Sequence, residues 1–126
     1  MALKLFRQSP NVLAISLSVN TTPIGNVRFT PIGAQYLNTA YINSINVEKE
    51  YQNKGIGTTL LTEMNNYLMA HTSAKEITGV LWDDNTDPFL SEFFFKNGYT
   101  PSDTQHLFYD DGVATFDIIP IERKLY

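Results

Sequence analysis

The residues best suited to chemistry form one glycine-rich segment, Gln52-Asn53-Lys54-Gly55-Ile56-Gly57-Thr58. The segment lies between an apolar, strand-like run, Tyr41 to Val47, and an amphipathic helical run, Ile56 to Ala70. A turn that leads from a strand into a helix presents unpaired backbone N–H groups, and the helix dipole adds positive potential at the same point. The two glycines lack the side chains that would keep a phosphate away from this backbone, and the lysine adds a positive charge. The segment therefore predicts a pyrophosphate-binding site.

A purely structural interpretation of the same segment is a tight strand-to-helix turn, in which glycine only supplies unusual backbone angles. Two well-known phosphate-binding patterns do not fit. A dinucleotide fingerprint needs a third glycine where Leu60 stands, and a Walker loop needs its lysine after the last glycine, whereas Lys54 precedes both. The residues alone leave both interpretations open.

The elements around this segment predict an α/β fold with one mixed sheet and two helices. Strand-like runs precede the segment at 3–7, 12–19, 24–31 and 41–48, as an antiparallel meander. A strand at 76–82, a helix from Asp87-Pro88 to Lys96 and two strands at 104–109 and 113–121 follow it. Because a helix joins the strand 41–48 to the strand 76–82, these two strands are expected to be parallel.

Length and composition exclude several classes of protein. The 126 residues suffice for a single domain, 1–126, and the apolar share of 43% is typical of a folded globule. No apolar run could span a bilayer and no signal-peptide pattern begins the chain, so the sequence predicts a cytoplasmic protein with no membrane partner. Cysteine is absent and no His/Asp/Glu spacing suggests a metal site. The formal charge of −4, without a basic cluster, argues against nucleic acid as a partner.

Two motifs resemble those of the GNAT acyltransferase superfamily. Ile45-Asn46-Val47 followed by the glycine-rich segment resembles its acyl-coenzyme A motif, and Phe93-Phe94-Phe95-Lys96-Asn97-Gly98-Tyr99 resembles its later aromatic-x-Lys-x-Gly-aromatic element. The resemblance covers most of the chain from Val12 onward. It implies a GNAT-like fold: a central mixed sheet with an antiparallel N-terminal meander, a splayed parallel strand pair and two main helices.

The resemblance also implies a co-substrate, acetyl-CoA, and a reaction. The backbone of Gln52, Asn53, Lys54, Gly55, Ile56, Gly57 and Thr58 would hold its pyrophosphate. Ile45, Asn46 and Val47 would pair with pantetheine beside the splayed strands, and the Val47 N–H would donate to the oxyanion. The implied activity is that of an N-acetyltransferase, in which a neutral primary amine attacks the thioester directly.

Several positions depart from the family pattern. Phe94 stands where the family often has a tyrosine that protonates the thiolate, and phenylalanine has no proton to donate. Asn43 stands where one branch has a glutamate base, and it can hold a water molecule without taking its proton. Asp87 replaces the asparagine common at the start of the later helix. Phe94 and Asp87 are still expected at the cofactor.

The candidate catalytic side chains come from the strand that precedes the glycine-rich segment. Tyr41 and Asn43 share strand parity with Ile45 and Val47, so we expect all four to face the slot. For Tyr41 and Asn43, ordinary sheet residues are the alternative interpretation.

The acceptor side of the chain is shorter than the family pattern. The chain passes from Arg7 to Val12 in a single turn, which leaves no room for the two helices that the family usually has there. The acceptor groove is then open, as for a protein amine, or completed by a second subunit in a homodimer; a small-molecule amine fits as well. The alternative function is a catalytically inactive coenzyme A-binding sensor or protein-interaction module.

Overall fold

The computed structural model describes residues 1–31, 38–82, 88–101, 105–108 and 115–126. Its elements are β1 (Ala2–Ser9), β2 (Val12–Val19), β3 (Thr22–Thr30), β4 (Thr39–Val47), the 3-10 helix η1 (Lys49–Tyr51), α1 (Ile56–His71), β5 (Glu76–Trp82), α2 (Pro88–Lys96), β6 (Thr100–Pro101), β7 (Gln105–Phe108) and β8 (Thr115–Lys124). The chain divides into two units: Met1–Ile77 with Leu125–Tyr126, and Thr78–Lys124. Each unit is described by itself, and a single domain over residues 1–126 stays a prediction.

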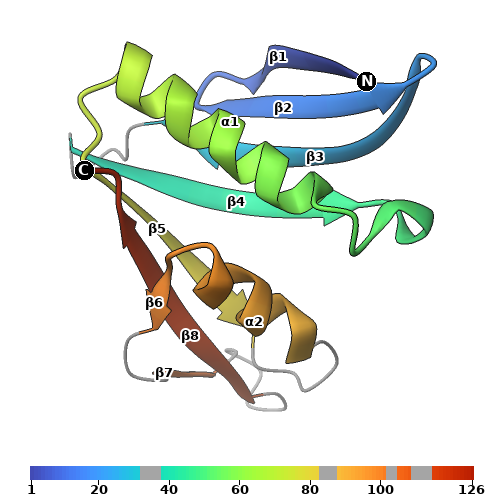
Figure 1. Ribbon diagram of the computed structural model, residues 1–126. Helices are drawn as coiled ribbons and strands as arrows, with labels where there is room; N and C mark the ends of the chain where they lie inside the picture. Colours follow the sequence, from blue (N-terminus) through green and yellow to red (C-terminus); the bar gives the residue numbers. More distant parts are fainter. Residues whose placement is uncertain (32–37, 83–87, 102–104, 109–114) are drawn as a thin grey trace. The chain divides into compact units, whose positions relative to one another are not determined.

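The first unit contains four antiparallel strands in the order β1-β2-β3-β4 (Figure 1). Their register aligns Leu5 with Ile15, Ile15 with Val27, and Val27 with Ile45. Because side chains alternate along a strand, this register gathers apolar residues on one face of the sheet. β1 leads into β2 with only residues 10 and 11 between them, so the predicted loss of the N-terminal helices is confirmed.

The helix α1 packs on the apolar face of these strands, against β2, β3 and β4 (Figure 1). The helix side chains that it buries recur with helical spacing: Ile56, Leu60, Leu61, Met64 and Leu68. Beneath them the sheet contributes the buried residues Leu13, Ile15, Leu17, Val27, Phe29 and Ile42. The amphipathic helix predicted from Ile56 is confirmed, and Tyr67, at the margin of the buried face, is half-buried against Phe29 with ring centroids 5.8 Å apart.

The strand β5 starts beside the start of β4. The N–H groups of Lys75 and Glu76 donate to the Asn38 carbonyl at 2.7 and 3.4 Å. The Thr39 hydroxyl also donates to the Glu76 carboxylate at 3.1 Å. Strands that start side by side and are joined by a helical crossover form a parallel pair, as predicted. The splay predicted further along this pair would involve both units, and it stays a prediction.

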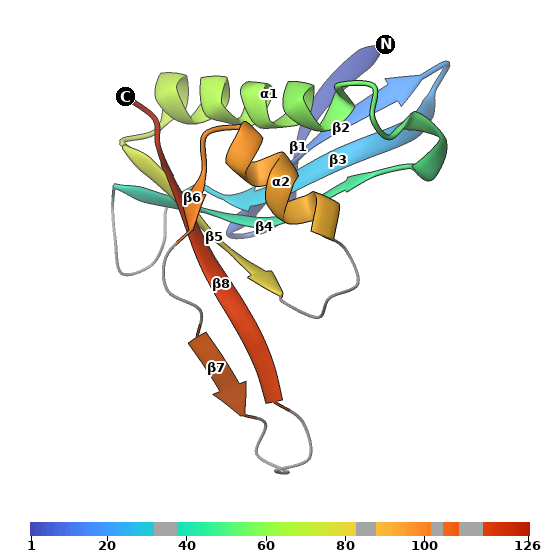
Figure 2. The same cartoon turned by 60° about the horizontal axis from the view of Figure 1, so that its bottom comes forward.

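The second unit consists of α2, the part of β5 from Thr78 onward, and the strands β8, β6 and β7 (Figure 2). β8 pairs antiparallel with both β6 and β7, and Gln105 lies opposite Ile118 in the latter pair. The predicted strands at 104–109 and 113–121 correspond to β7 and β8, whereas β6 was not predicted because a two-residue strand leaves no pattern. The connection between β7 and β8 lies outside the described residues.

Candidate functional site

A turn of distinctive backbone geometry connects β4 to α1. η1 follows β4, and the Gln52 side chain then donates from Nε2 to the Val47 carbonyl at 3.0 Å, which fastens the turn to the end of the strand. Asn53 and Gly55 both have left-handed backbone angles, with φ of 63° and 82°. Only glycine adopts such angles without steric strain, which explains Gly55 at the point where the helix begins.

The first turn of α1 lacks a partner for its positive end. Gly55 is the N-cap residue and provides no side chain to cap the helix. The first main-chain bond of the helix runs from the Thr59 N–H to the Gly55 carbonyl at 3.0 Å, so the N–H groups of residues 56–58 precede it. The first turn also contains no acidic residue, although helix dipoles favour carboxylates there. An external anion would supply the missing negative charge.

Access to this helix start is unobstructed within its unit. Residues 52–55 are all exposed, and a Cβ atom placed on Gly55 would meet nothing within 4 Å. The exposed Lys54 has its ammonium 5.5 Å from the centroid of the Tyr51 ring, a cation–π contact that keeps the charge beside the turn. Backbone donors, space and a nearby cation are the features that the predicted pyrophosphate site requires.

Gly25, a residue that was not predicted from the sequence, allows the start of α1 to pack closely on the sheet. Gly25 lies in β3 under the first turn of α1, where a Cβ atom would approach the Asn46 carbonyl oxygen to 3.1 Å and Leu60 Cδ1 to 3.3 Å. Glycine at this position therefore lets the helix start lie close to the sheet. An isolated glycine within a strand is the signal that could have identified it.

The register of β4 contradicts the prediction that the catalytic candidates lie on the same face of the sheet as Ile45 and Val47. Ile42 pairs with Phe29 and Ser44 pairs with Arg28, so Asn43 is an extra residue and forms a β-bulge. Tyr41 and Asn43, both exposed, therefore lie on the face away from α1, whereas Ile45 and Val47 align with Val27 and Gly25 on the other face. The expectation that all four residues share one face is wrong, because a single inserted residue reverses the alternation.

The other residues of β4 that were predicted at the cofactor are Ile45, Asn46 and Val47. Ile45 and Val47 are half-buried, and Asn46 is exposed. Predicted contacts of their backbone with pantetheine stay a prediction.

Phe94 and Asp87 belong to the second unit. Phe94 is only 4% exposed, and its ring packs edge-on against Tyr99 with centroids 5.2 Å apart. Phe95 is the exposed member of its aromatic run, at 40%. Asp87 lies outside the described residues. A cofactor role for Phe94 or Asp87 stays a prediction.

One group in the second unit has a shifted pKa. Burial raises the pKa of Tyr99 from 10.0 to about 12, and the nearby positive charge of Arg123 opposes this rise. The Tyr99 hydroxyl is buried and has no hydrogen-bond partner within the described part of the chain, so the neutral form is strongly favoured. This phenol is therefore a poor proton donor at neutral pH.

The comparisons with known proteins agree with this geometry. Residues 2–99 match the family described as the acetyltransferase (GNAT) family. A GNAT-family protein from Desulfovibrio desulfuricans is similar in structure with a TM-score of 0.81 and 15% sequence identity, over 92% of this chain and 70% of that chain. No curated protein matches the sequence.

Two further solved structures carry more specific names. The ribosomal-protein-S18-alanine N-acetyltransferase of Escherichia coli has a TM-score of 0.73 and 18% identity, over 94% of this chain and 72% of that chain. The PaiA N-acetyltransferase of Thermoplasma acidophilum, solved with coenzyme A, has a TM-score of 0.68 and 24% identity, over 90% of this chain and 61% of that chain. At these identities the likeness shows a shared fold.

Neither helix in the described part of the chain has the length and apolar character needed to cross a membrane.

Proposed function

This chain belongs to the acetyltransferase (GNAT) family, and we propose that it transfers the acetyl group of acetyl-CoA to a primary amine by direct attack. The observation that carries the proposal is the uncapped, acid-free start of α1 beside an open Gly55. That arrangement supports binding of a diphosphate, which coenzyme A contains. The coenzyme A complex of the Thermoplasma protein, which is similar in fold, adds support.

The residues from Gln52 to Thr58 would hold the diphosphate. The N–H groups of Ile56, Gly57 and Thr58 would donate to its oxygens, and the exposed Lys54 would neutralise part of its charge. Gln52 contributes indirectly, because its side chain ties the turn to β4. Asn53 supplies the left-handed angle that turns the chain into the helix.

Bound acetyl-CoA supplies an acyl group activated as a thioester. In the proposed reaction the neutral amine attacks the acyl carbon, a C–N bond forms, and the C–S bond breaks to release the thiolate. Backbone from Ile45 to Val47 would align the acyl chain, and the Val47 N–H would stabilise the oxyanion. The amine loses one proton to water, and the thiolate gains one from solvent.

Proton transfer does not need a strong acid or base among these residues. A free thiol has a pKa of ~8.5, so thiolate can leave without a general acid, and Phe94 is then no obstacle. Asn43 and Tyr41 are exposed on the face away from α1. In our proposal the ammonium proton reaches solvent through a chain of ordered water molecules on this face, and Asn43 and Tyr41 hold the outer end of that chain.

A catalytically inactive coenzyme A-binding module is the second candidate. It is favoured by Phe94, which is buried among aromatic rings where the family often has an acid, and by Asn43 where one branch has a base. Turnover, measured as release of free thiol from acetyl-CoA with a panel of alkylamines, peptides and aminoglycosides, separates the two. Binding without turnover would establish the inactive module.

The test of the binding site introduces a charge where the proposal places the diphosphate. Thr58→Glu puts a carboxylate into the first turn of α1, and Thr62→Glu puts the same charge one turn further along, at another exposed threonine. We expect calorimetry to show acetyl-CoA binding at least about tenfold weaker for Thr58→Glu and changed less than about twofold for Thr62→Glu.

Unfolding of Thr58→Glu would not explain the expected difference in acetyl-CoA affinity between the two variants. A first-turn glutamate stabilises a helix by about 0.3–1 kcal/mol, so Thr58→Glu should unfold no more easily than the wild-type protein. Equal affinities of the two variants, or no association of the wild-type protein with acetyl-CoA, would contradict the proposed site.

A further inference from the structure

The face of the first unit opposite α1 carries an ordered set of polar side chains. The Thr30 hydroxyl donates to Asn43 Oδ1 at 3.0 Å, and Arg28 Nε donates to Ser44 Oγ at 2.9 Å. The bulge in β4 is the reason that the consecutive residues Asn43 and Ser44 both reach this face. The pairing holds the Arg28 side chain across β3 and β4 in one orientation.

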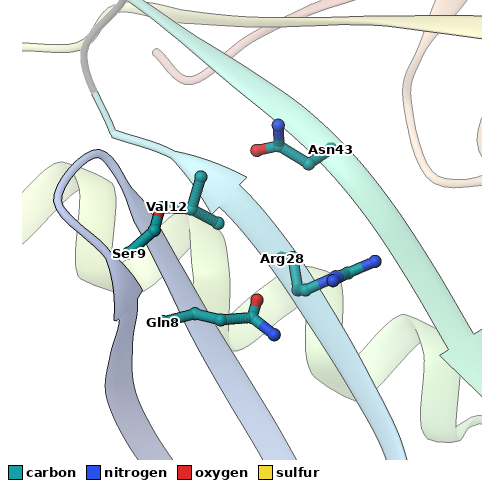
Figure 3. Close-up of a pocket in the computed structure, with 5 residues that line it drawn as sticks. All are labelled: Gln8, Ser9, Val12, Arg28 and Asn43. Atoms are coloured by element: carbon teal, nitrogen blue, oxygen red, sulfur yellow. The ribbon is translucent and has the colours of Figure 1, made fainter.

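A hollow of about 420 Å³ opens on this face beside Arg28. Gln8 and Ser9 line it from β1, Val12 from β2, Arg28 from β3 and Asn43 from β4 (Figure 3). None of the five lining residues is acidic, and the guanidinium is their only charged group. In a protein with a net charge of −4, this is a local cationic site rather than part of a basic surface.

Arg28 is suited to recognise an oxyanion here. The side chain is half-buried, and guanidinium groups stay charged at any physiological pH. Its Nε is occupied by Ser44, and no other residue in the described part of the chain bonds its terminal nitrogens. Those two nitrogens form the planar fork that matches a carboxylate, while the amide of Gln8 offers further donors.

An unsatisfied acceptor lies between this hollow and the proposed acyl site. Asn26 lies on the same face as Arg28, and its Oδ1 is buried with no hydrogen-bond partner among the residues that the structure describes. The register places Arg28 opposite Ser44, Asn26 opposite Asn46 and Gly25 opposite Val47, so Asn26 lies on the way from the hollow to Val47. A donor such as an amine is what this position lacks.

We propose that the hollow binds the carboxylate of the amine acceptor, with Arg28 as its anchor, so that the acceptor class is an amino acid or short peptide whose amine is several bonds from a free carboxylate. The proposal rests on the proposed acetyl transfer at Val47. Three residues of extended strand, roughly 10 Å, separate Ser44 from Val47. An α-amine beside its own carboxylate would not span this distance, whereas an ω-amino acid or a short peptide would.

The test compares two acceptors that differ only in the carboxylate: ε-aminocaproate and ε-aminocaproamide. We expect the wild-type protein to acetylate the acid with a kcat/KM about tenfold to a hundredfold higher than that of the amide. Arg28→Gln should remove this preference by lowering the value for the acid alone, with the KM for acetyl-CoA unchanged. Lys75→Gln, which removes an exposed positive charge from the segment between α1 and β5, should leave the preference intact.

A binding measurement separates failure of the site from failure of the reaction. N-acetyl-ε-aminocaproate, its amide and inorganic phosphate are titrated into each protein without acetyl-CoA and followed by NMR. Saturable binding of the acid that Arg28→Gln abolishes, with none of the amide, supports the site even if no amine is acetylated, in which case the proposed reaction falls.

Two results would overturn the site. One is acetylation of acid and amide at equal rates by both the wild-type protein and Arg28→Gln, which leaves the reaction standing. The other is binding of phosphate as tight as, or tighter than, binding of the acid, because the hollow would then select phosphate and not a carboxylate.

Discussion

Gly55 and Gly98 have nearly the same left-handed backbone, with φ of 82° and 93°, in very different surroundings. A Cβ atom on Gly55 would meet nothing within 4 Å. A Cβ atom on Gly98 would lie 2.8 Å from Arg123 Nε. One glycine begins a helix beside open space, and the other ends a helix beneath a packed side chain.

The surroundings of Gly98 are explained by the protein's own packing. The Gly98 N–H donates to the Phe95 carbonyl at 3.2 Å and the Tyr99 N–H to the Phe94 carbonyl at 3.0 Å, the two bonds of a Schellman motif. The rings of Phe94 and Tyr99 then meet across the turn. No side chain among the described residues covers Gly55, and the open space beside it is where we propose that the ligand binds. The two glycines meet the same backbone requirement and differ in their surroundings, and the proposed ligand would occupy the open space beside Gly55.

The largest expected effect is on stability, from Gly98→Ala. A left-handed non-glycine residue costs about 1–2 kcal/mol, and overpacking against Arg123 adds about 1–3 kcal/mol. We expect urea denaturation to show a loss of about 3 kcal/mol in the free energy of unfolding. A loss of only about 1–2 kcal/mol, which the backbone strain alone explains, would show that Arg123 moves aside without strain, and the contrast with Gly55 would weaken.

A smaller loss of stability, combined with a loss of binding, is expected from Gly55→Ala. Only the backbone strain of about 1–2 kcal/mol applies, because no atom crowds the new methyl group. The methyl group would stand where the diphosphate approaches, so acetyl-CoA should bind about tenfold more weakly by calorimetry. Unchanged affinity in this variant would mean that the open space beside Gly55 is not part of the ligand site.

The smallest expected effect at neutral pH is that of Tyr99→Phe. This variant tests whether the side chains packed next to Gly98 exclude water from the Tyr99 hydroxyl. Removing the unpartnered hydroxyl should change the free energy of unfolding at pH 7 by no more than about 0.5 kcal/mol. The pKa of Tyr99 is higher in the folded state, so its contribution is fully present below pH 10 and is lost as the pH rises toward about 12.

The pH dependence of stability provides a control, because only the wild-type protein carries the Tyr99 hydroxyl. At pH 11 the wild-type protein should have lost about 1 kcal/mol more stability than Tyr99→Phe, as measured by urea denaturation at each pH. Parallel losses in the two proteins would indicate that water reaches the Tyr99 hydroxyl.

Much of the fold could be predicted from local patterns. The predicted bounds of β2 and β5 coincide with the observed ones, because alternating or continuous apolar residues between turn signals define a strand. The start of α1 at Ile56 was also predicted, since a glycine and a helical apolar repeat mark the same position. The glycine-rich turn as an anion site follows from the chemistry of a helix N-terminus alone.

Other features have no local signature. The bulge at Asn43 inserts one residue into a strand whose composition is unchanged, yet it reverses the face on which Tyr41 and Asn43 lie. The burial of Phe94 depends on Tyr99 packing across the end of α2, which a run of three phenylalanines does not specify.

The sequence by itself therefore determined most of the elements, their order and the glycine-rich turn before α1, because each depends on residues within one helical turn or one strand of each other. Only the tertiary structure decided which side chains meet. The hollow beside Arg28 draws its lining from four strands, and their register, set by hydrogen bonds between distant segments, brings Gln8 and Asn43 to the same place.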